Sequence, residues 1–156
     1  MDAITLLKAD HKKVGELLED IKGLSQSAHV ERRKLFEQID RDLTVHSKIE
    51  ETIFYPALKK KAQIGNDDDA KQEVLEAYEE HSNVKGMLKK LERTEATDET
   101  YNAKLQVLGE LVKHHVHEEE HEMFREARDL MSETELDALG VELARAKEEL
   151  MSGGPA

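Results

Sequence analysis

The stretch KHHVHEEEHE, residues 113–122, places four histidines and four glutamates in ten positions. Both residue types bind metal ions and transfer protons, but both are also ordinary on a solvated helix surface. Spacing along the whole chain separates these possibilities. His115 is the last of four histidines that recur at intervals of 35, 35 and 34 residues: His11, His46, His81 and His115.

The apolar residues around these histidines predict the fold. They recur at three- and four-residue intervals in four long segments, which predicts amphipathic helices over 2–23, 30–54, 70–93 and 98–130. Four such helices with short polar connections predict an all-α fold, an up-down-up-down antiparallel four-helix bundle. Pro56 is expected to end or kink the second helix, because proline lacks the amide hydrogen. Residues 63–70 are expected to form a loop.

A fifth, shorter helix is predicted after the bundle. Ser132 and Glu135 have the spacing of a capping box, so the helix should begin at 132 and run to about residue 150. We expect the helical bundle at 1–131, the C-terminal helix at 132–150 and a disordered tail at 151–156. The C-terminal helix should pack across the bundle or support a dimer contact.

Composition excludes several classes of function. Lysine and arginine number 23 against 35 acidic residues, a net charge of −12, which makes nucleic acid and anionic membranes poor partners. The chain has no cysteine, so disulfides and thiolate chemistry are excluded. No apolar segment has the length of a signal peptide or a membrane span. We expect a cytoplasmic monomer or weak homodimer.

The histidine spacing places all four side chains in one layer. Successive histidines lie at nearly equal distances from the turn between them, and equal distance means equal height in antiparallel neighbours. Each histidine is also central on an apolar stripe, as His11 is between Leu7 and Val14. A single histidine of this kind is usually a hydrogen-bonded core residue. Four in one dry layer would lack partners, whereas a metal ion bound by neutral imidazoles removes that cost.

Two glutamates belong to the same layer. Glu50 is four residues after His46, and Glu119 is four after His115, so each shares the face of its histidine. Two buried carboxylates need cations. The sequence therefore predicts a dinuclear site whose ligands are His11, His46, Glu50, His81, His115 and Glu119. Iron fits these nitrogen and oxygen ligands best and manganese second, while structural zinc would more often recruit cysteine.

Outside this set, the interpretation is plainer. His114 is expected beside the site or on the surface, and a solvated face is expected for His117, Glu118, Glu120 and His121. His29 is expected on the surface. Tyr55 and Tyr78 lie near the layer, either as hydrogen-bond donors to the ligands or as core packing.

The pattern of a single histidine, then HxxxE, repeated twice over four helices, resembles the hemerythrin-like HHE cation-binding family. The segments that carry the resemblance, which covers about residues 2–130, are DAITLLKADHKKV, HSKIEETIFYPAL, YEEHSNVKGML and HHVHEEEHEMF. The resemblance implies a non-haem di-iron centre in which His11 and His46 serve one iron. His81 and His115 would serve the other, with Glu50 and Glu119 bridging.

The chain departs from the oxygen-carrying members of that family. Those members have a second histidine four residues from the one on the third helix, whereas Ala77 and Lys85 stand four residues before and after His81. Their last carboxylate is an aspartate five residues after its histidine, whereas here it is Glu119, four residues after His115. We therefore expect a di-iron protein that reacts with oxygen, peroxide or nitric oxide in sensing, scavenging or peroxidase- or catalase-like turnover. The alternatives are an iron or reversible oxygen-binding module without turnover and a metal-free helical interaction protein.

Overall fold

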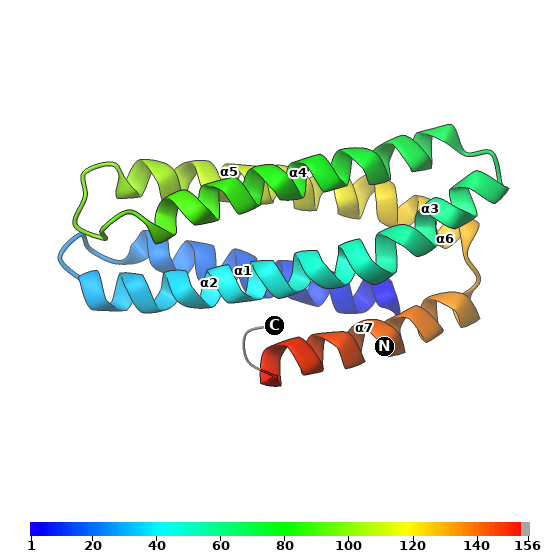
Figure 1. Cartoon of the computed structure of the whole chain (residues 1–156), viewed down its shortest axis with the longest axis horizontal. Coiled ribbons are helices and arrows are strands. Elements are labelled where there is room, and N and C mark those ends of the chain that lie inside the picture. Colours follow the sequence, from blue (N-terminus) through cyan, green and yellow to red (C-terminus); the bar gives the residue numbers. More distant parts are fainter. Residues whose placement is uncertain (154–156) are drawn as a thin grey trace.

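The computed structural model describes residues 1–153, which are helical apart from their ends and short turns. Four long helices run antiparallel, as Figure 1 shows: α1 (Ala3–Gly23), α2 (His29–Ile49), α4 (Asp68–Glu92) and α5 (Tyr101–Glu118). α1 packs against α2 and α5, and α4 packs against α5 and α2, which closes the bundle. The predicted all-α, up-down-up-down four-helix bundle is confirmed.

Side-chain caps begin three of the helices. Asp2 accepts from the Thr5 amide at 2.8 Å, and Asp67 accepts from the Ala70 amide at 3.0 Å. Ser132 and Glu135 form the predicted capping box in front of α7 (Glu133–Ser152). These caps satisfy amide groups that have no partner within the first turn of a helix.

The helix that contains Pro56 does not end there. It passes from α2 through a π-helical turn, η1 (Glu50–Phe54), into α3 (Tyr55–Ile64), and the loop predicted at 63–70 shrinks accordingly. In the wider turn the Tyr55 amide donates to the Glu50 carbonyl, five residues back. Pro56 cannot donate to the next carbonyl, that of Glu51, and the Tyr78 hydroxyl donates to it instead at 3.0 Å. The wider turn and Tyr78 together accommodate the proline.

A second π-helical turn makes the two halves of the bundle equivalent. η2 (Glu119–Met123) joins α5 to α6 (Phe124–Leu130), and it begins 69 residues after η1. We call residues 3–64 the first half and residues 68–130 the second half. Equivalent residues of the two halves are 69 or 70 positions apart, as Glu50 and Glu119 are.

Two apolar clusters lie on the two sides of the histidine layer. One contains residues from the π-helical turns, α3, α6 and α7, such as Phe54, Leu58, Phe124 and Leu136. The other fills the opposite end of the bundle, with residues such as Val14, Ile39, Leu88 and Leu108. The layer is therefore a polar interruption of an otherwise apolar interior.

The C-terminal helix α7 packs across the first half, against α1, α2 and η1 (Figure 1). Gly140 permits this contact, because a Cβ there would lie 2.9 Å from the Asp2 carbonyl carbon and 3.0 Å from the Ala3 amide nitrogen. α7 ends at Ser152, two residues beyond the predicted end. Of the predicted disordered tail, residues 154–156 lie outside the described residues.

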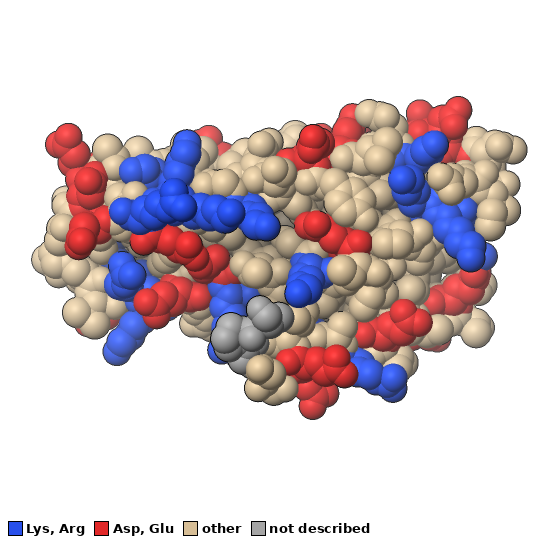
Figure 2. All heavy atoms as spheres, viewed as in Figure 1, with Lys and Arg blue, Asp and Glu red and all other residues tan. Residues whose placement is uncertain are grey.

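Charged side chains of both signs are interspersed over the face of the molecule in Figure 2. None of the helices within residues 1–153 has the length and apolar character needed to cross a membrane.

Candidate metal centre

The structure brings the six predicted ligand residues together in one buried layer. α1 contributes His11, α2 contributes His46, α4 contributes His81 and α5 contributes His115, while the two glutamates open the π-helical turns. All six side chains are buried, and Glu50 is 0% and Glu119 1% exposed. A carboxylate this far from water needs a cationic partner to remain ionised.

The ligand atoms form two groups that share Glu50. One group holds His11, His46, Glu50 and Glu119, and the other holds Glu50, His81 and His115; within each group the ligand atoms lie within 4.8 Å of one another. Glu119 also approaches the second group, because its Oε2 lies 3.3 Å from His115 Nε2. The arrangement is that of two adjacent ion positions with carboxylates between them.

All four imidazoles point Nε2 into the layer. His46 Nε2 and His81 Nε2 each lie 3.1 Å from Glu50 Oε1, and His11 Nε2 lies 2.9 Å from Glu119 Oε1. His81 Nε2 and His115 Nε2 are only 3.1 Å apart. Two ring nitrogens at this distance cannot both carry a proton without repulsion, whereas both can face a cation.

Unpartnered buried atoms provide a test of whether a metal fits. Within residues 1–153, four atoms of the layer are buried and have no hydrogen-bond partner: His11 Nε2, His46 Nε2, Glu50 Oε2 and Glu119 Oε1. The nitrogens are close to carboxylate oxygens but are not aligned for hydrogen bonds to them. Buried polar atoms without partners are rare, and atoms that converge without mutual hydrogen bonds are arranged as ligands of a common ion. The donor set of imidazole and carboxylate fits a divalent transition metal.

A carboxylate holds the other nitrogen of every imidazole. The Nδ1 distances are 2.7 Å from His11 to Glu120, 2.9 Å from His46 to Asp10, 2.7 Å from His81 to Glu51 and 2.7 Å from His115 to Glu80. Such a contact keeps the Nδ1 proton in place, so that Nε2 is left to bind a metal, and it fixes the ring orientation. The two halves repeat this arrangement, since Glu51 and Glu120 directly follow the ligand glutamates and Asp10 and Glu80 directly precede His11 and His81.

Sequence reasoning missed these four carboxylates. It assigned Glu120 to a solvated face, and this was wrong, because Glu120 is half-buried and contacts His11 Nδ1. The signal that could have found the set is its recurrence at the 69- and 70-residue offset. Periodicity alone places Glu51 and Glu120 off the ligand face, and only the packing of neighbouring helices turns them toward a histidine.

Charges in the layer shift the pKa values of its groups. Burial lowers the pKa of His46, but Glu50, Asp10 and Glu119 outweigh it and raise the pKa to about 10. Burial likewise lowers the pKa of His115, and hydrogen bonds to Glu119, Glu50 and Glu80 raise it to about 12. The pKa of Glu50 lies well below its ordinary value, because His46 and other neighbours overcome the effect of burial. Without a metal, the layer thus holds protons where cations are needed.

Tyr55 adds a hydroxyl to the layer. Its Oη donates to Glu119 Oε2 and lies 3.2 Å from Glu50 Oε1, 3.2 Å from His81 Nε2 and 3.3 Å from His115 Nε2. Burial and the charges of Glu119 and Glu50 raise the pKa of Tyr55 well above its ordinary value. The π-helical turn brings Tyr55 onto the face of Glu50, because five residues complete the wider turn. The Tyr78 hydroxyl donates to the Glu51 carbonyl, and the Tyr78 ring lies edge-on to that of Tyr55, with centroids 5.4 Å apart.

The remaining histidines lie outside the layer. His29 is on the surface, as expected, and the exposed rings of His117 and His121 are 4.2 Å apart. His114 is exposed and lies near Glu118 and Glu80, with Nε2 at 3.2 Å and 3.5 Å from their carboxylate oxygens. Glu118 is half-buried rather than fully solvated.

Comparisons with known proteins identify the family and agree with the fold. The model of the hemerythrin HHE cation binding domain matches residues 2–127. A crystal structure of a hemerythrin HHE cation binding domain-containing protein from Mycobacterium kansasii is similar with a TM-score of 0.84 at 25% identity, covering 98% of this chain and 89% of that one. A protein of Nostoc sp. named DNA nickase is 25% identical over 158 residues; the match covers 100% of this chain but only 42% of the relative. Because the family model matches most of its length, the chain belongs to the hemerythrin HHE cation-binding domain family.

Proposed function

We propose that this chain is a non-haem di-iron protein that reacts with oxygen, peroxide or nitric oxide. The observation that carries the proposal is the pair of ligand groups sharing Glu50, in which four buried atoms lack a hydrogen-bond partner within residues 1–153. His11, His46 and the two glutamates would hold one iron, and His81, His115 and the same glutamates would hold the other. Manganese is the second candidate, because it accepts the same ligand types.

Iron so held would supply a redox change for oxygen, peroxide or nitric oxide. The residues of the chain prepare the site for it. The four carboxylates at Nδ1 keep each imidazole in one orientation and leave Nε2 for the metal. The Tyr55 hydroxyl holds a proton within 3.3 Å of two imidazoles, where it can stabilise negative charge on a ligand.

A small, mostly apolar cavity beside the layer supports the proposal that the ligand is small. It borders the imidazoles on the side away from α3, has a volume of about 20 Å³ and is lined by Val14, Leu43, Val84, Val112 and Val116. A cavity needs roughly 10–15 Å³ to admit a molecule the size of water. The volume therefore suits a diatomic molecule or peroxide, and the walls also include Asp10 and Ser47 beside the four imidazoles.

The sequence supports reaction over reversible oxygen carriage. Ala77 is buried and Lys85 is exposed, so neither adds a ligand to the His81 side, and both irons would keep open coordination positions. An iron or reversible oxygen-binding module without turnover is the alternative.

DNA nicking is the named activity of the Nostoc relative, most of which has no counterpart in this chain, and a net charge of −12 disfavours a DNA partner. We keep a cytoplasmic monomer or weak homodimer as part of the proposal.

Metal analysis and peroxide consumption test the proposal. Purified protein should contain about two irons per chain after reconstitution. Glu50→Ala and Glu119→Ala should each lower the iron content and abolish peroxide consumption, because each glutamate serves both irons. His121→Ala is the matched control, since His121 is an exposed histidine of the same helical segment.

The outcomes are distinct. Folded protein without iron after reconstitution would overturn the proposal. Iron binding without peroxide consumption or reaction with nitric oxide would favour the alternative module. Equal effects of all three variants would show that the ligands are misassigned.

A further inference from the structure

Glu80 faces two histidines that follow one another on α5. Its Oε1 holds His115 Nδ1 at 2.7 Å, and its Oε2 lies 3.5 Å from His114 Nε2. Glu118, one turn after His114, places Oε1 3.2 Å from the same nitrogen. The ligand atoms of Glu80, His114 and Glu118 lie within 4.8 Å of one another, and the exposed His114 makes them accessible from solvent. This is one imidazole and two carboxylates, the donor set of a divalent-cation site.

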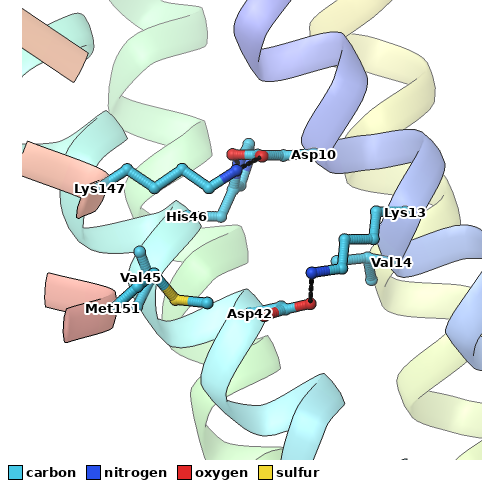
Figure 3. A pocket seen from close by; sticks show the side chains of 8 residues that line it. All are labelled: Asp10, Lys13, Val14, Asp42, Val45, His46, Lys147 and Met151. Atoms are coloured by element: carbon cyan, nitrogen blue, oxygen red, sulfur yellow. Dashed lines mark hydrogen bonds and ion pairs between the residues drawn. The ribbon is translucent and has the colours of Figure 1, made fainter. Parts of the chain in front are cut away.

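The first half of the bundle provides an internal comparison. Asp10, equivalent to Glu80, holds His46 Nδ1 with one oxygen and accepts from Lys147 Nζ with the other. Figure 3 shows Lys147 reaching from α7 to Asp10 beside His46. Val45 and Ile49 occupy the positions equivalent to His114 and Glu118. In the first half the Lys147 ammonium therefore pairs with the carboxylate, and Val45 and Ile49 offer no metal ligand at these two positions.

In the second half, different residues surround Glu80, the carboxylate equivalent to Asp10. α7 packs on α1 and α2, so Glu80 has no lysine equivalent to Lys147 within residues 1–153. Instead, two potential metal ligands, His114 and Glu118, replace two apolar residues at the same positions. The ligand geometry of the interior does not require this change, because the first half keeps the same geometry without it.

A small cavity of about 10 Å³ borders both the surface group and the interior layer. It lies between α4, α5 and η2, and Glu80 and Glu118 line it together with His115 and Glu119 of the layer. Its other walls include Glu73, Glu76 and Glu122. The equivalent residues of the first half are Ala3, Leu6 and Ile53, of which Ala3 and Leu6 are buried in the core that α7 completes. The cavity beside His46 in the first half also has two carboxylates, but Asp10 and Asp42 are paired there with Lys147 and Lys13. Among the described residues that line the cavity of the second half there is no lysine or arginine.

We propose that Glu80, His114 and Glu118 form a surface site for a divalent cation, from which iron passes along this acidic cavity to the interior centre. The transfer of iron to the interior centre rests on the proposed di-iron function, but cation binding at the surface site does not depend on it. Removing the surface ligands should slow the loading of iron without changing the amount finally bound. Glu80 is unsuitable for the test, because it also orients His115.

Zinc binding tests the surface site. Titration of the iron-loaded protein by calorimetry, with iron content checked afterwards, should show one further zinc per chain. His114→Ala and Glu118→Gln should weaken this binding by about tenfold or more, while His29→Ala, at an exposed histidine in the first turn of α2, should not. Absence of the additional zinc, or its retention in His114→Ala, would overturn the proposal. In metal-free protein, zinc should still shift the NMR signals of the His114 imidazole, so failure of the interior centre would not hide the surface site.

Iron uptake tests the route. After mixing metal-free protein with limiting ferrous iron, His114→Ala and Glu118→Gln should load roughly tenfold more slowly than wild type and His29→Ala, and the difference should shrink with excess iron. All four proteins should reach the same final iron content. Equal rates would overturn the loading role, and so would a lower final content, which would instead mark His114 or Glu118 as support for the interior ligands.

Discussion

Tyr55 and Phe124 occupy equivalent positions directly after the two π-helical turns, yet only Tyr55 brings a hydroxyl into the ligand layer. Phe124 stacks on His11 instead, with ring centroids 5.8 Å apart and an angle of 5° between the planes. The His81–His115 side of the layer thus has a polar neighbour, and the His11 side has an aromatic one. Two ligand groups related by an internal repeat are chemically different.

Replacing Tyr55 by phenylalanine should destabilise the metal-free protein. The hydroxyl donates to Glu119 and lies beside Glu50, and its loss would remove one donor from these buried carboxylates. Urea unfolding should show a loss of about 1–3 kcal/mol. Tyr78→Phe is the control and should cost less, because Tyr78 is half-buried and water can replace it at the Glu51 carbonyl. Equal losses would contradict a special place for Tyr55.

Iron loading should release protons. At neutral pH the imidazoles of His46 and His115 are protonated in the metal-free protein, since their pKa values are about 10 and about 12. A metal bound through Nε2 replaces a proton on each ring, so we expect about two protons released per chain and an affinity that increases with pH. Calorimetry in buffers of different ionisation enthalpy measures this number. Loading without proton release would mean that these imidazoles are neutral in the metal-free protein or do not bind the metal.

The same protonation should make the stability of the metal-free protein depend on pH. The pKa of His46 in the folded state lies above its ordinary value of 6.5. Its stabilising ion pairs are therefore fully present below pH 6.5 and are lost as the pH rises through about 10. The melting temperature of the metal-free protein should fall over this range, and that of the iron-loaded protein should fall less. Parallel curves for the two forms would contradict the expectation.

Asp40→Asn should stabilise the protein at alkaline pH. Burial and the neighbouring Glu92 raise the pKa of Asp40 from 3.8 to about 7. Ionisation of Asp40 thus opposes folding, with a cost that begins above pH 3.8 and grows as the pH rises through about 7. The melting temperature of Asp40→Asn should exceed that of wild type at alkaline pH and match it in acid. The exposed Asp20→Asn serves as control and should change neither value.

Two glycine substitutions should have opposite effects. A Cβ at Gly140 would meet the backbone of Asp2 and Ala3, so Gly140→Ala should push α7 from α1 and lower the melting temperature. Gly86 lies within α4 with nothing within 4 Å of an added Cβ. Gly86→Ala should therefore stabilise by about 0.4–1 kcal/mol, because alanine restricts the unfolded chain. A stable Gly140→Ala would show that the contact between α7 and α1 is adaptable.

Much of the fold and of the ligand layer could be predicted because both depend on spacing. The apolar period predicts the helices, and the 34- and 35-residue intervals place His11, His46, His81 and His115 at one height. Glu50 and Glu119 follow from their four-residue distance to a histidine. These relationships are properties of a regular helix, and they need no knowledge of neighbouring side chains.

The rest depends on departures from the regular helix and on contacts between helices. The sequence interpretation allowed Pro56 to end a helix, because the Tyr78 hydroxyl that compensates for it comes from another helix. Glu120 lies outside the ligand face by period, and it reaches His11 only because α1 and α5 are neighbours. The position of α7 depends on the fit of Gly140 against the N-terminal backbone. A local pattern contains none of this information.

Each π-helical turn holds one residue more than the α-helix would need there, and this determines where the chain can lose length. Deleting a residue from a regular helix rotates everything beyond it by about 100° relative to what precedes it. Within η2, removal of the exposed His121 would only convert the wide turn into an ordinary one, and Phe124 would remain on the face of Glu119. Deletion of the exposed Lys113, in the regular part of α5, would turn His115 away from Val112 and the bundle interior. The bundle should thus tolerate deletion of one residue within a π-helical turn, beside the ligand glutamates, but not deletion of one residue in the regular helix nearby.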